Sequence, residues 1–327
     1  MVQIITPYSN RNVVVIGGGP SGMSCALWLK NYGLVPIIVE TRASLGGLQG
    51  QSRVSNTWLL GWRSVTGHDV AETFARHICY ERIQHFVSSR ITGLRRVDKL
   101  WSVKIETSDA HSASFEAMAI VIATGTESVG SDWASSIAGG DTCHSRIFIG
   151  PASYGDPSFW LGSKPIIVGG GDNAIECAIF LAGRGSNPLV VARGGLRAGT
   201  AYRERMASLV TAGAARLCLN TSITALRNDK DALHATLSTG EKVEGDALLL
   251  ILGFQPTLSA LLPMMSVADR PKLDDHGYVT IDQDCRTNIP GLWAVGDVAN
   301  QRHPCTATAM AMGTMAARTI AWDAQTN

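Results

Sequence analysis

Three glycines near the start of the chain, Gly17, Gly19 and Gly22, have the spacing with which a turn binds the pyrophosphate of a dinucleotide. In this pattern the first glycine makes the tight turn, the second lets a phosphate approach the backbone, and the third lets helix and strand pack closely. Glu40 follows at the end of the next apolar run, where an acid accepts hydrogen bonds from a ribose. A glycine-rich turn that binds nothing would not need this acid, so we predict a first dinucleotide site here.

The same pattern recurs at Gly169, Gly171 and Ala174. Here the second apolar run is followed by Arg193 rather than by an acid, and Arg197 comes shortly after it. Arginine suits the 2′-phosphate of NADP, so the second site is predicted to prefer NADPH to NADH. The alternative is that both arginines are surface residues and that the second site is empty or degenerate.

Apolar runs and helical spacing around both turns predict the elements that position them. "NVVVI" and "VPIIVE" flank a segment with helical spacing, "MSCALWLKNYG", and "KPIIV" and "PLVVA" flank the second turn in the same way. Short continuous apolar runs are typical of buried parallel strands. The sequence therefore predicts an α/β fold with two Rossmann-like nucleotide-binding domains of three-layer ββα type, one inserted in the other. The small-residue pattern of "TATAMAMGTMAARTIAW" predicts a tightly packed C-terminal helix.

Composition narrows the class of protein and its location. The formal net charge of +1 does not favour binding to nucleic acid or to an anionic membrane. Apolar runs such as "ALLLILGF" are far shorter than the about 20 residues that span a bilayer, and the first residues lack the pattern of a signal peptide, so a cytoplasmic location is expected. The seven cysteines are scattered with no C-x-x-C spacing, which disfavours a disulfide framework and a zinc site, and no metal is expected.

The order of motifs resembles that of the thioredoxin-reductase-like, two-domain members of the pyridine nucleotide-disulfide oxidoreductase superfamily. It runs "VVVIGGGPSG", Glu40, "LGG", "IVIATG", "IIVGGGDNAIE", "LILGFQP", "GLWAVGDV" and "ATAMAMGTMAA", and it covers essentially the whole chain. The resemblance implies FAD in a discontinuous domain of residues 1–124 and 255–327, and a pyridine nucleotide in the inserted residues 125–254. It also implies a homodimer.

The resemblance extends to individual residues of both sites. Asp297 is expected to hydrogen bond the ribityl chain of FAD. The other positions that the resemblance assigns to FAD are Gly17, Gly19, Pro20, Ser21, Gly22, Glu40, Gly47, Thr124, Gly125 and Thr306. The positions assigned to NADPH are Gly169, Gly171, Asp172, Asn173, Ala174, Glu176, Arg193 and Arg197.

One departure from the family bears directly on the chemistry. Thioredoxin reductases carry a redox-active C-x-x-C-D before the second glycine turn, and the matching residues here are Ala152-Ser153-Tyr154-Gly155-Asp156. The acid remains and both sulfurs are missing, so the usual dithiol relay is excluded. No catalytic residue is assigned beyond the flavin itself, and the weak candidates are Tyr154 and Cys305.

Further departures lie in the second half of the chain. The family's Arg-Gln-Ala at the start of the C-terminal helix is Pro304-Cys305-Thr306 here. A thiol at a helix N-terminus can be reactive, but a lone cysteine more often serves packing. Of the family's H-R-R-x-x-x-R motif, which binds the 2′-phosphate of NADP, only Arg193 and Arg197 remain here. We therefore expect weaker binding of NADPH. The aromatic residues Trp58, Trp62, Tyr154, Phe159 and Trp160 either cover a flavin face or fill core and interface.

These observations favour an FAD-dependent oxidoreductase that passes electrons between NADPH and an external acceptor directly through the flavin, like the ferredoxin/flavodoxin–NADP reductases of this type. The acceptor is expected to be a small molecule or a small redox protein such as ferredoxin or flavodoxin. A true thioredoxin reductase is not expected. Three alternatives stay open. The first is an enzyme that reduces a low-molecular-weight disulfide. The second is a flavoprotein with a degenerate pyridine-nucleotide site, either an enzyme that receives electrons from ferredoxin or a non-catalytic sensor, and the third is a flavin monooxygenase. The last rests on Phe148 and Gly150 of an F-x-G-x-x-x-H pattern, with Tyr154 in place of its histidine.

Overall fold

The structure is a computed structural model that describes residues 9–154, 160–230, 232–300 and 302–326. The chain forms two compact units. Unit 1 comprises Met1–Glu127 and Gln255–Asn327, and unit 2 comprises Ser128–Phe254. The domain boundaries predicted from the sequence lie after residues 124 and 254.

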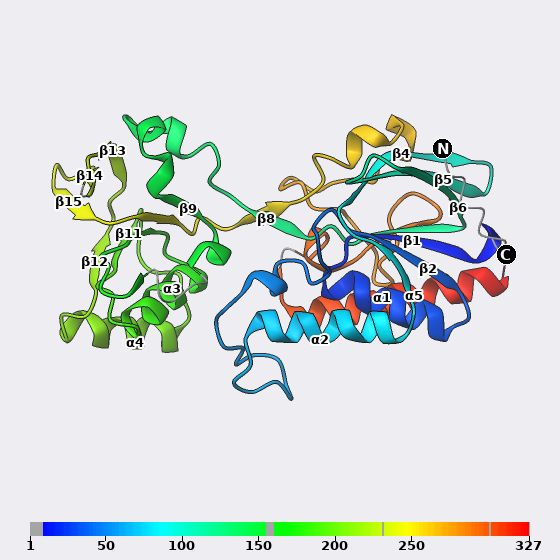
Figure 1. The fold of residues 1–327 in the computed structure, drawn as a ribbon, viewed down its shortest axis with the longest axis horizontal. Coiled ribbons are helices and arrows are strands. Elements are labelled where there is room, and N and C mark those ends of the chain that lie inside the picture. The colour runs from blue at the N-terminus through cyan, green and yellow to red at the C-terminus, as the bar shows by residue number, and fades with distance from the viewer. Residues whose placement is uncertain (1–8, 155–159, 231, 301, 327) are drawn as a thin grey trace. The chain divides into compact units, whose positions relative to one another are not determined.

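Unit 1 is built on a parallel sheet with the strand order β18-β7-β1-β2-β3. Its strands are β1 (Asn12–Ile16), β2 (Val35–Val39), β3 (Gln84–Phe86), β7 (Ala119–Ile122) and β18 (Leu292–Ala294). One face is covered by the helices α1 (Pro20–Asn31), α2 (Gly67–Tyr80) and α5 (Thr306–Thr326) (Figure 1). The other face packs against an antiparallel sheet of β4 (Ser89–Val97), β5 (Leu100–Thr107) and β6 (Ser112–Ala117).

Side chains along the strands of unit 1 point alternately to the two faces of the parallel sheet, and an apolar core lies on each face. In β1, Val13 and Val15 point to the helices, whereas Val14 and Ile16 point to the antiparallel sheet and pack in the cluster that contains Trp101. Both faces of the central strand are therefore buried, which explains its continuous apolar run. The three-layer ββα arrangement predicted from the sequence is confirmed.

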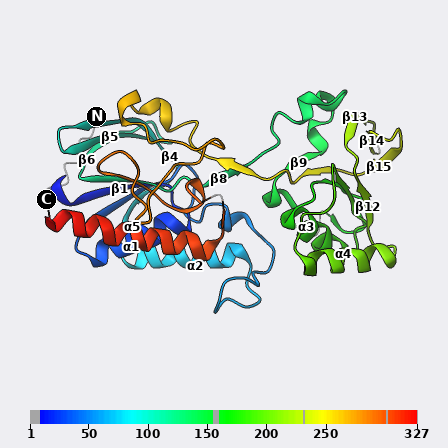
Figure 2. The same ribbon diagram turned by 180° about the vertical axis from the view of Figure 1, so that it is seen from behind.

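The C-terminal helix packs closely against α1 (Figure 2). A Cβ added at Gly313 would lie 2.3 Å from the Ser21 carbonyl oxygen, so only glycine fits at this crossing. Ser24 also donates a hydrogen bond of 2.8 Å to the Met310 carbonyl. The predicted tight packing of this helix is confirmed. Because α5 packs directly against α1, the two helices lie in the same layer of unit 1.

Unit 2 repeats the arrangement with fewer helices. Its parallel sheet has the order β12-β11-β10-β16-β9. The strands are β9 (Ile147–Ile149), β10 (Ile166–Val168), β11 (Leu189–Ala192), β12 (Arg216–Leu219) and β16 (Leu248–Leu250). The helices are α3 (Asp172–Ala182) and α4 (Thr200–Thr211), and the antiparallel sheet is β13 (Ile223–Asn228), β14 (Leu233–Leu237) and β15 (Lys242–Gly245).

Two connections join the units and pair with each other as β8 (Thr126–Ser128) and β17 (Phe254–Pro256). Gln255 Nε2 donates to Glu127 Oε1 across this pair, at 3.0 Å. Among the described residues, no helix has the length and apolar character needed to cross a membrane.

Candidate functional site

The first glycine turn joins β1 to α1 and leaves no space for side chains at two of its glycines. Gly17 has a φ of +113°, and a Cβ there would lie 2.2 Å from the Ala123 carbonyl oxygen. A Cβ at Gly22 would lie 2.0 Å from the Gly17 carbonyl oxygen. The turn therefore brings the end of β1, the start of α1 and the end of β7 together.

Gly19 differs because the space beside it is open. The nearest atom to an added Cβ is Gly47 Cα, at 3.8 Å. Gly19 is the N-cap residue of α1, Pro20 follows at the first helical position, and no described side chain caps the helix. The backbone N–H groups of Ser21 and Gly22 at this helix start are suited to an anionic pyrophosphate.

Glu40 has a structural task that the sequence pattern does not reveal. Its Oε2 accepts a hydrogen bond of 2.7 Å from the Gly18 N–H, and its Oε1 accepts one of 2.8 Å from the Arg42 N–H. The buried carboxylate thus ties the glycine turn to the end of β2. A carboxylate has about four lone-pair positions, so capacity remains for a ribose hydroxyl.

Two buried polar atoms near this turn lack a partner among the described residues. They are Asp297 Oδ1, in the segment after β18, and Thr124 Oγ1, in the segment after β7. Burial raises the pKa of the Asp297 carboxyl group. Buried polar groups are normally hydrogen bonded, so these two atoms fit a bound ligand with hydroxyl groups such as FAD. Gly125, with a φ of +66° and open space around its Cβ position, follows Thr124 directly.

Gly47 and Thr306 border the same cradle. A Cβ at Gly47 would lie 3.0 Å from Gly19 Cα. Thr306, the first residue of α5, donates a hydrogen bond of 2.9 Å to Gln49 Oε1, in the short helix η2 (Gln49–Gln51). The structure therefore brings the predicted FAD positions together at one end of the parallel sheet of unit 1.

Cys305 is exposed at the start of α5, and its sulfur accepts a hydrogen bond from the Thr308 N–H at 3.5 Å. This contact is that of an N-cap residue, a structural role that the sequence analysis missed. Tyr154 ends the turn η6 (Pro151–Tyr154), and its side chain lies outside what the structure describes, as do residues 155–159. The Ser153 hydroxyl donates a hydrogen bond of 2.6 Å to the carbonyl of Gly150, the residue before this turn.

The aromatic residues that the sequence analysis grouped differ in their surroundings. Trp160 is buried in unit 2 and packs edge-on against Phe148. Trp62 packs edge-on against Phe74, with 5.9 Å between ring centroids, whereas Trp58 is exposed. Trp160 therefore fills the core of unit 2, whereas Trp58 does not lie in the core, and for Trp58 the readings as interface residue or flavin cover stay predictions.

The second glycine turn repeats the geometry of the first. A Cβ at Gly169 would lie 2.4 Å from the Ile251 carbonyl oxygen and 3.0 Å from Ala174 Cβ. Gly171, the N-cap residue of α3, has nothing within 4 Å of its Cβ position. Asn173 is exposed in the first turn of α3. This helix start has the same opening for a phosphate.

Arg193 and Arg197 follow β11 and are both exposed. Neither forms an ion pair with any residue in the described ranges. The Arg197 N–H donates to the Gly170 carbonyl at 2.8 Å, which holds this segment beside the glycine turn. The guanidinium groups are thus available to an anion next to the second turn.

Two acids predicted to contact NADPH also hold this arginine segment in place. Asp172 Oδ1 accepts a hydrogen bond of 2.7 Å from the Gly199 N–H, and Glu176 Oε1 accepts one of 2.8 Å from the Tyr202 hydroxyl. The first bond joins α3 to the N-cap residue of α4, and the second joins α3 to the first turn of α4. Tyr202 gives no recognisable signal in the sequence.

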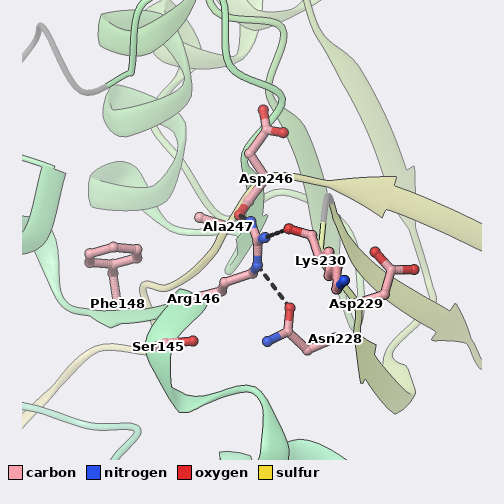
Figure 3. A pocket seen from close by; sticks show the side chains of 8 residues that line it. All are labelled: Ser145, Arg146, Phe148, Asn228, Asp229, Lys230, Asp246 and Ala247. Carbon is pink, nitrogen blue, oxygen red and sulfur yellow. Dashed lines mark hydrogen bonds between the residues drawn. The ribbon is translucent and has the colours of Figure 1, made fainter.

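A separate pocket of about 400 Å³ lies elsewhere in unit 2 (Figure 3). It is lined by Ser145, Arg146, Phe148, Asn228, Asp229, Lys230, Asp246 and Ala247. Arg146 donates to Asn228 Oδ1 and to the carbonyl oxygens of Asp246 and Lys230, at 2.8, 2.9 and 3.1 Å. Because this guanidinium already serves the fold and no residue of the second glycine turn lines the pocket, we do not assign it to a nucleotide.

Comparison with known proteins places this geometry in context. The family model described as pyridine nucleotide-disulphide oxidoreductase matches residues 11–313. A ferredoxin–NADP reductase of Ignicoccus hospitalis is 27% identical over 299 residues, which cover 88% of this chain and 90% of that protein. One component of the alkyl hydroperoxide reductase of Staphylococcus aureus is 25% identical over 309 residues; these are 94% of this chain but only 57% of that protein. A thioredoxin reductase structure from Lactococcus lactis, 22% identical, superposes with a TM-score of 0.79 over 96% of this chain and 98% of that one.

The two kinds of glycine in the first turn predict different effects of the same substitution. Gly19→Val has room in the FAD-free protein, so we expect a folded variant that has lost most of its FAD because the side chain fills the phosphate space. Gly22→Val forces a backbone contact and should unfold at a clearly lower temperature. Flavin absorbance per chain and thermal unfolding measure both, with Gly171→Val as the matched control that keeps FAD. Retention of one FAD per chain by Gly19→Val would contradict the assignment.

The raised pKa of Asp297 predicts a pH dependence. A carboxyl group whose pKa is higher in the folded chain is stabilising relative to its ionised form at low pH, and the folded chain loses stability as the pH rises from the usual value of about 3.9 through the raised pKa. FAD-free Asp297→Asn should therefore melt at a higher temperature than FAD-free wild type at pH 7, with no difference below about pH 4. It should also bind FAD more weakly, because an amide offers one acceptor oxygen instead of two. The exposed Asp275→Asn is the control, and equal melting of Asp297→Asn and wild type at pH 7 would contradict the account.

Proposed function

Because the chain belongs to the pyridine nucleotide-disulphide oxidoreductase family, we propose that it passes electrons from NADPH through FAD to an external acceptor without a dithiol relay. Membership of this family and the similarity to the relatives above identify the chain as an FAD-dependent NAD(P)H oxidoreductase. The observation that carries the rest of the proposal is the replacement of both relay sulfurs by Ala152 and Gly155. The acceptor must then take electrons from the flavin itself.

The environment of the remaining cysteines supports this proposal. Burial raises the pKa of the Cys177 thiol well above its usual value, and burial together with nearby Asp282 and Asp284 raises the pKa of Cys285 to about 12. Burial also raises the pKa of Cys25. A thiol–disulfide relay needs a thiolate, and these thiols stay protonated at neutral pH. Of the free cysteines in the described ranges, only Cys79 and Cys305 are exposed.

In the proposed mechanism, the protein binds and orients two nucleotides. When bound, FAD supplies the exchange between a hydride donor and one- or two-electron acceptors. The start of α1 holds the pyrophosphate, Glu40 a ribose hydroxyl, and Asp297 and Thr124 hydroxyl groups of the ligand. Arg193 and Arg197 hold the 2′-phosphate of NADPH, and Asp172 and Glu176 keep the arginine segment in position.

The second site has the features of an intact site rather than a degenerate one. Gly171 leaves the helix start open, and two exposed arginines, which form no ion pair with a described residue, lie beside it. These features support NADPH as the donor over a flavoprotein that has lost its pyridine nucleotide.

For the acceptor we propose a small redox protein of ferredoxin or flavodoxin type. The support is the ferredoxin–NADP reductase relative, which this chain matches over 90% of that protein's length. The alkyl hydroperoxide reductase component supports less, since this chain spans only 57% of it. The homodimer and the cytoplasmic location expected from the sequence stay predictions.

The proposal predicts which acceptors are reduced. NADPH oxidation by the FAD-loaded protein should reduce ferricyanide, and ferredoxin or flavodoxin, but should not reduce thioredoxin coupled to insulin. Authentic thioredoxin reductase serves as the positive control in the same assay. Thioredoxin reduction at a comparable rate that persists in Cys305→Ser would show that another relay exists and refute the proposal.

The two arginines predict the choice of nucleotide. Each charge-assisted hydrogen bond to the 2′-phosphate contributes about 1.5–3 kcal/mol, so kcat/KM should favour NADPH over NADH by about ten-fold or more. The double variant Arg193→Ala, Arg197→Ala should lose this preference by raising KM for NADPH alone. Arg95→Ala, Arg96→Ala, two exposed arginines of β4, is the matched control. Equal kcat/KM values for NADPH and NADH in the wild type would show that the second site does not recognise the 2′-phosphate.

A further inference from the structure

The loop between η2 and α2 exposes large apolar side chains. We call residues 53–64 the tip loop; Figure 1 shows it in blue, extending beyond α2 and away from the sheets of unit 1. Leu60 is 98% exposed and Trp58 is 77% exposed. Neighbouring apolar groups with such exposure mark a surface that contacts another molecule, and tryptophan is prominent among residues that dominate binding energy.

The backbone holds the base of the tip loop in a defined shape. Ser55 and Thr66 form a bridge, and the Asn56 N–H donates to the Val65 carbonyl at 2.6 Å. Asn56 Oδ1 accepts hydrogen bonds of 2.9 Å from the N–H groups of Trp58 and Leu59. A surface with a fixed shape loses little conformational entropy when it binds, which favours a docking role.

The charge of the tip loop selects the kind of partner. It carries Arg53 and Arg63, both exposed, and the segment from residue 41 to residue 68 contains no Asp or Glu. Neither guanidinium forms an ion pair with a described carboxylate. The next acid along the chain, Asp69, accepts hydrogen bonds from Thr66, and Arg53 is close enough to contribute to the lowered pKa of the Asp69 carboxyl group. This local positive charge on a chain of net charge +1 complements an acidic protein.

The tip loop also starts beside the predicted FAD cradle. It follows η2, whose Gln49 binds Thr306 at the start of α5, and η2 follows Gly47, which packs against Gly19. A protein bound to the tip loop therefore docks on the unit that contains the cradle, next to the segment that borders it.

We propose that the tip loop is the docking surface for a small acidic electron-carrier protein, with Trp58 and Leu60 as the apolar contacts and Arg53 and Arg63 as the steering charges. This inference rests on the proposed function and names the surface that function would use. For each NADPH oxidised to NADP⁺, two ferredoxin-type carriers take up one electron each and one proton is released.

The test compares two loop variants with matched controls. The apolar variant is Trp58→Ser, Leu60→Ser, with Val267→Ser, Leu273→Ser as its control, since these residues of unit 1 are also exposed. The charge variant is Arg53→Gln, Arg63→Gln, with Arg95→Gln, Arg96→Gln as its control. The probes are an acidic [2Fe–2S] ferredoxin and a flavodoxin, and ferricyanide reports reactions that need no docking.

We expect the apolar variant to raise KM for ferredoxin about ten-fold or more. The charge variant should raise it several-fold and flatten its dependence on ionic strength. Both should reduce ferricyanide at the wild-type rate, and both controls should behave as wild type with every acceptor.

Three results would overturn the inference. Loop variants that reduce both carriers like the wild type would show that docking occurs elsewhere. Dissociation of a dimer into monomers by the apolar variant would show that the tip loop is an interface between two copies of this chain. Wild-type protein that reduces ferricyanide but neither carrier would overturn the docking inference and leave electron transfer from NADPH through FAD intact. Wild-type protein that also fails to reduce ferricyanide would count against the proposed function itself.

Discussion

At the turn between β1 and α1, a Cβ on Gly22 would lie 2.0 Å from the Gly17 carbonyl oxygen, and this close approach sets the start of α1. Glu40 fixes the same turn from the side by accepting a hydrogen bond from Gly18. The open end of α1, with room at Gly19, then faces the segments that carry Gly47, Asp297 and Thr124. The predicted FAD site in unit 1 depends on this contact together with the approach of Gly17 to the Ala123 carbonyl, because the first sets the start of α1 and the second brings the turn to the segment that carries Thr124.

The second glycine turn shares another close approach of the first, that of its first glycine to a neighbouring carbonyl, but it has a different electrostatic outcome. Gly169 approaches the Ile251 carbonyl closely and Gly171 leaves the helix start open, as in the first turn. After the second strand of each turn, however, unit 1 has a buried carboxylate at Glu40 and unit 2 has exposed guanidinium groups at Arg193 and Arg197. A carboxylate accepts hydrogen bonds from ribose hydroxyls and repels a phosphate, whereas arginine attracts one. One backbone geometry therefore suits two different nucleotides.

The sequence predicts the parts of the fold that depend on backbone patterns. The strands around both glycine turns, the ββα layering and the packed C-terminal helix follow from apolar runs and from small residues such as Gly313, and the structure contains all of them. The missed features depend on side chains that are distant in sequence or that have an unremarkable type. The hydrogen bonds from Gly18 to Glu40 and from Tyr202 to Glu176, the capping of α5 by Cys305 and the exposure of Trp58 require the folded coordinates, because no periodicity or spacing encodes them.

The central claim is that electrons leave the flavin directly, with no thiol pair between it and the acceptor. An anaerobic reductive titration tests this claim, because it counts the electrons that the FAD-loaded protein takes up. The account predicts that one NADPH, carrying two electrons, fully bleaches the flavin of each chain and that further reductant is not consumed. Uptake of four electrons per FAD, with the second pair stored in a thiol pair formed from a disulfide, would contradict it.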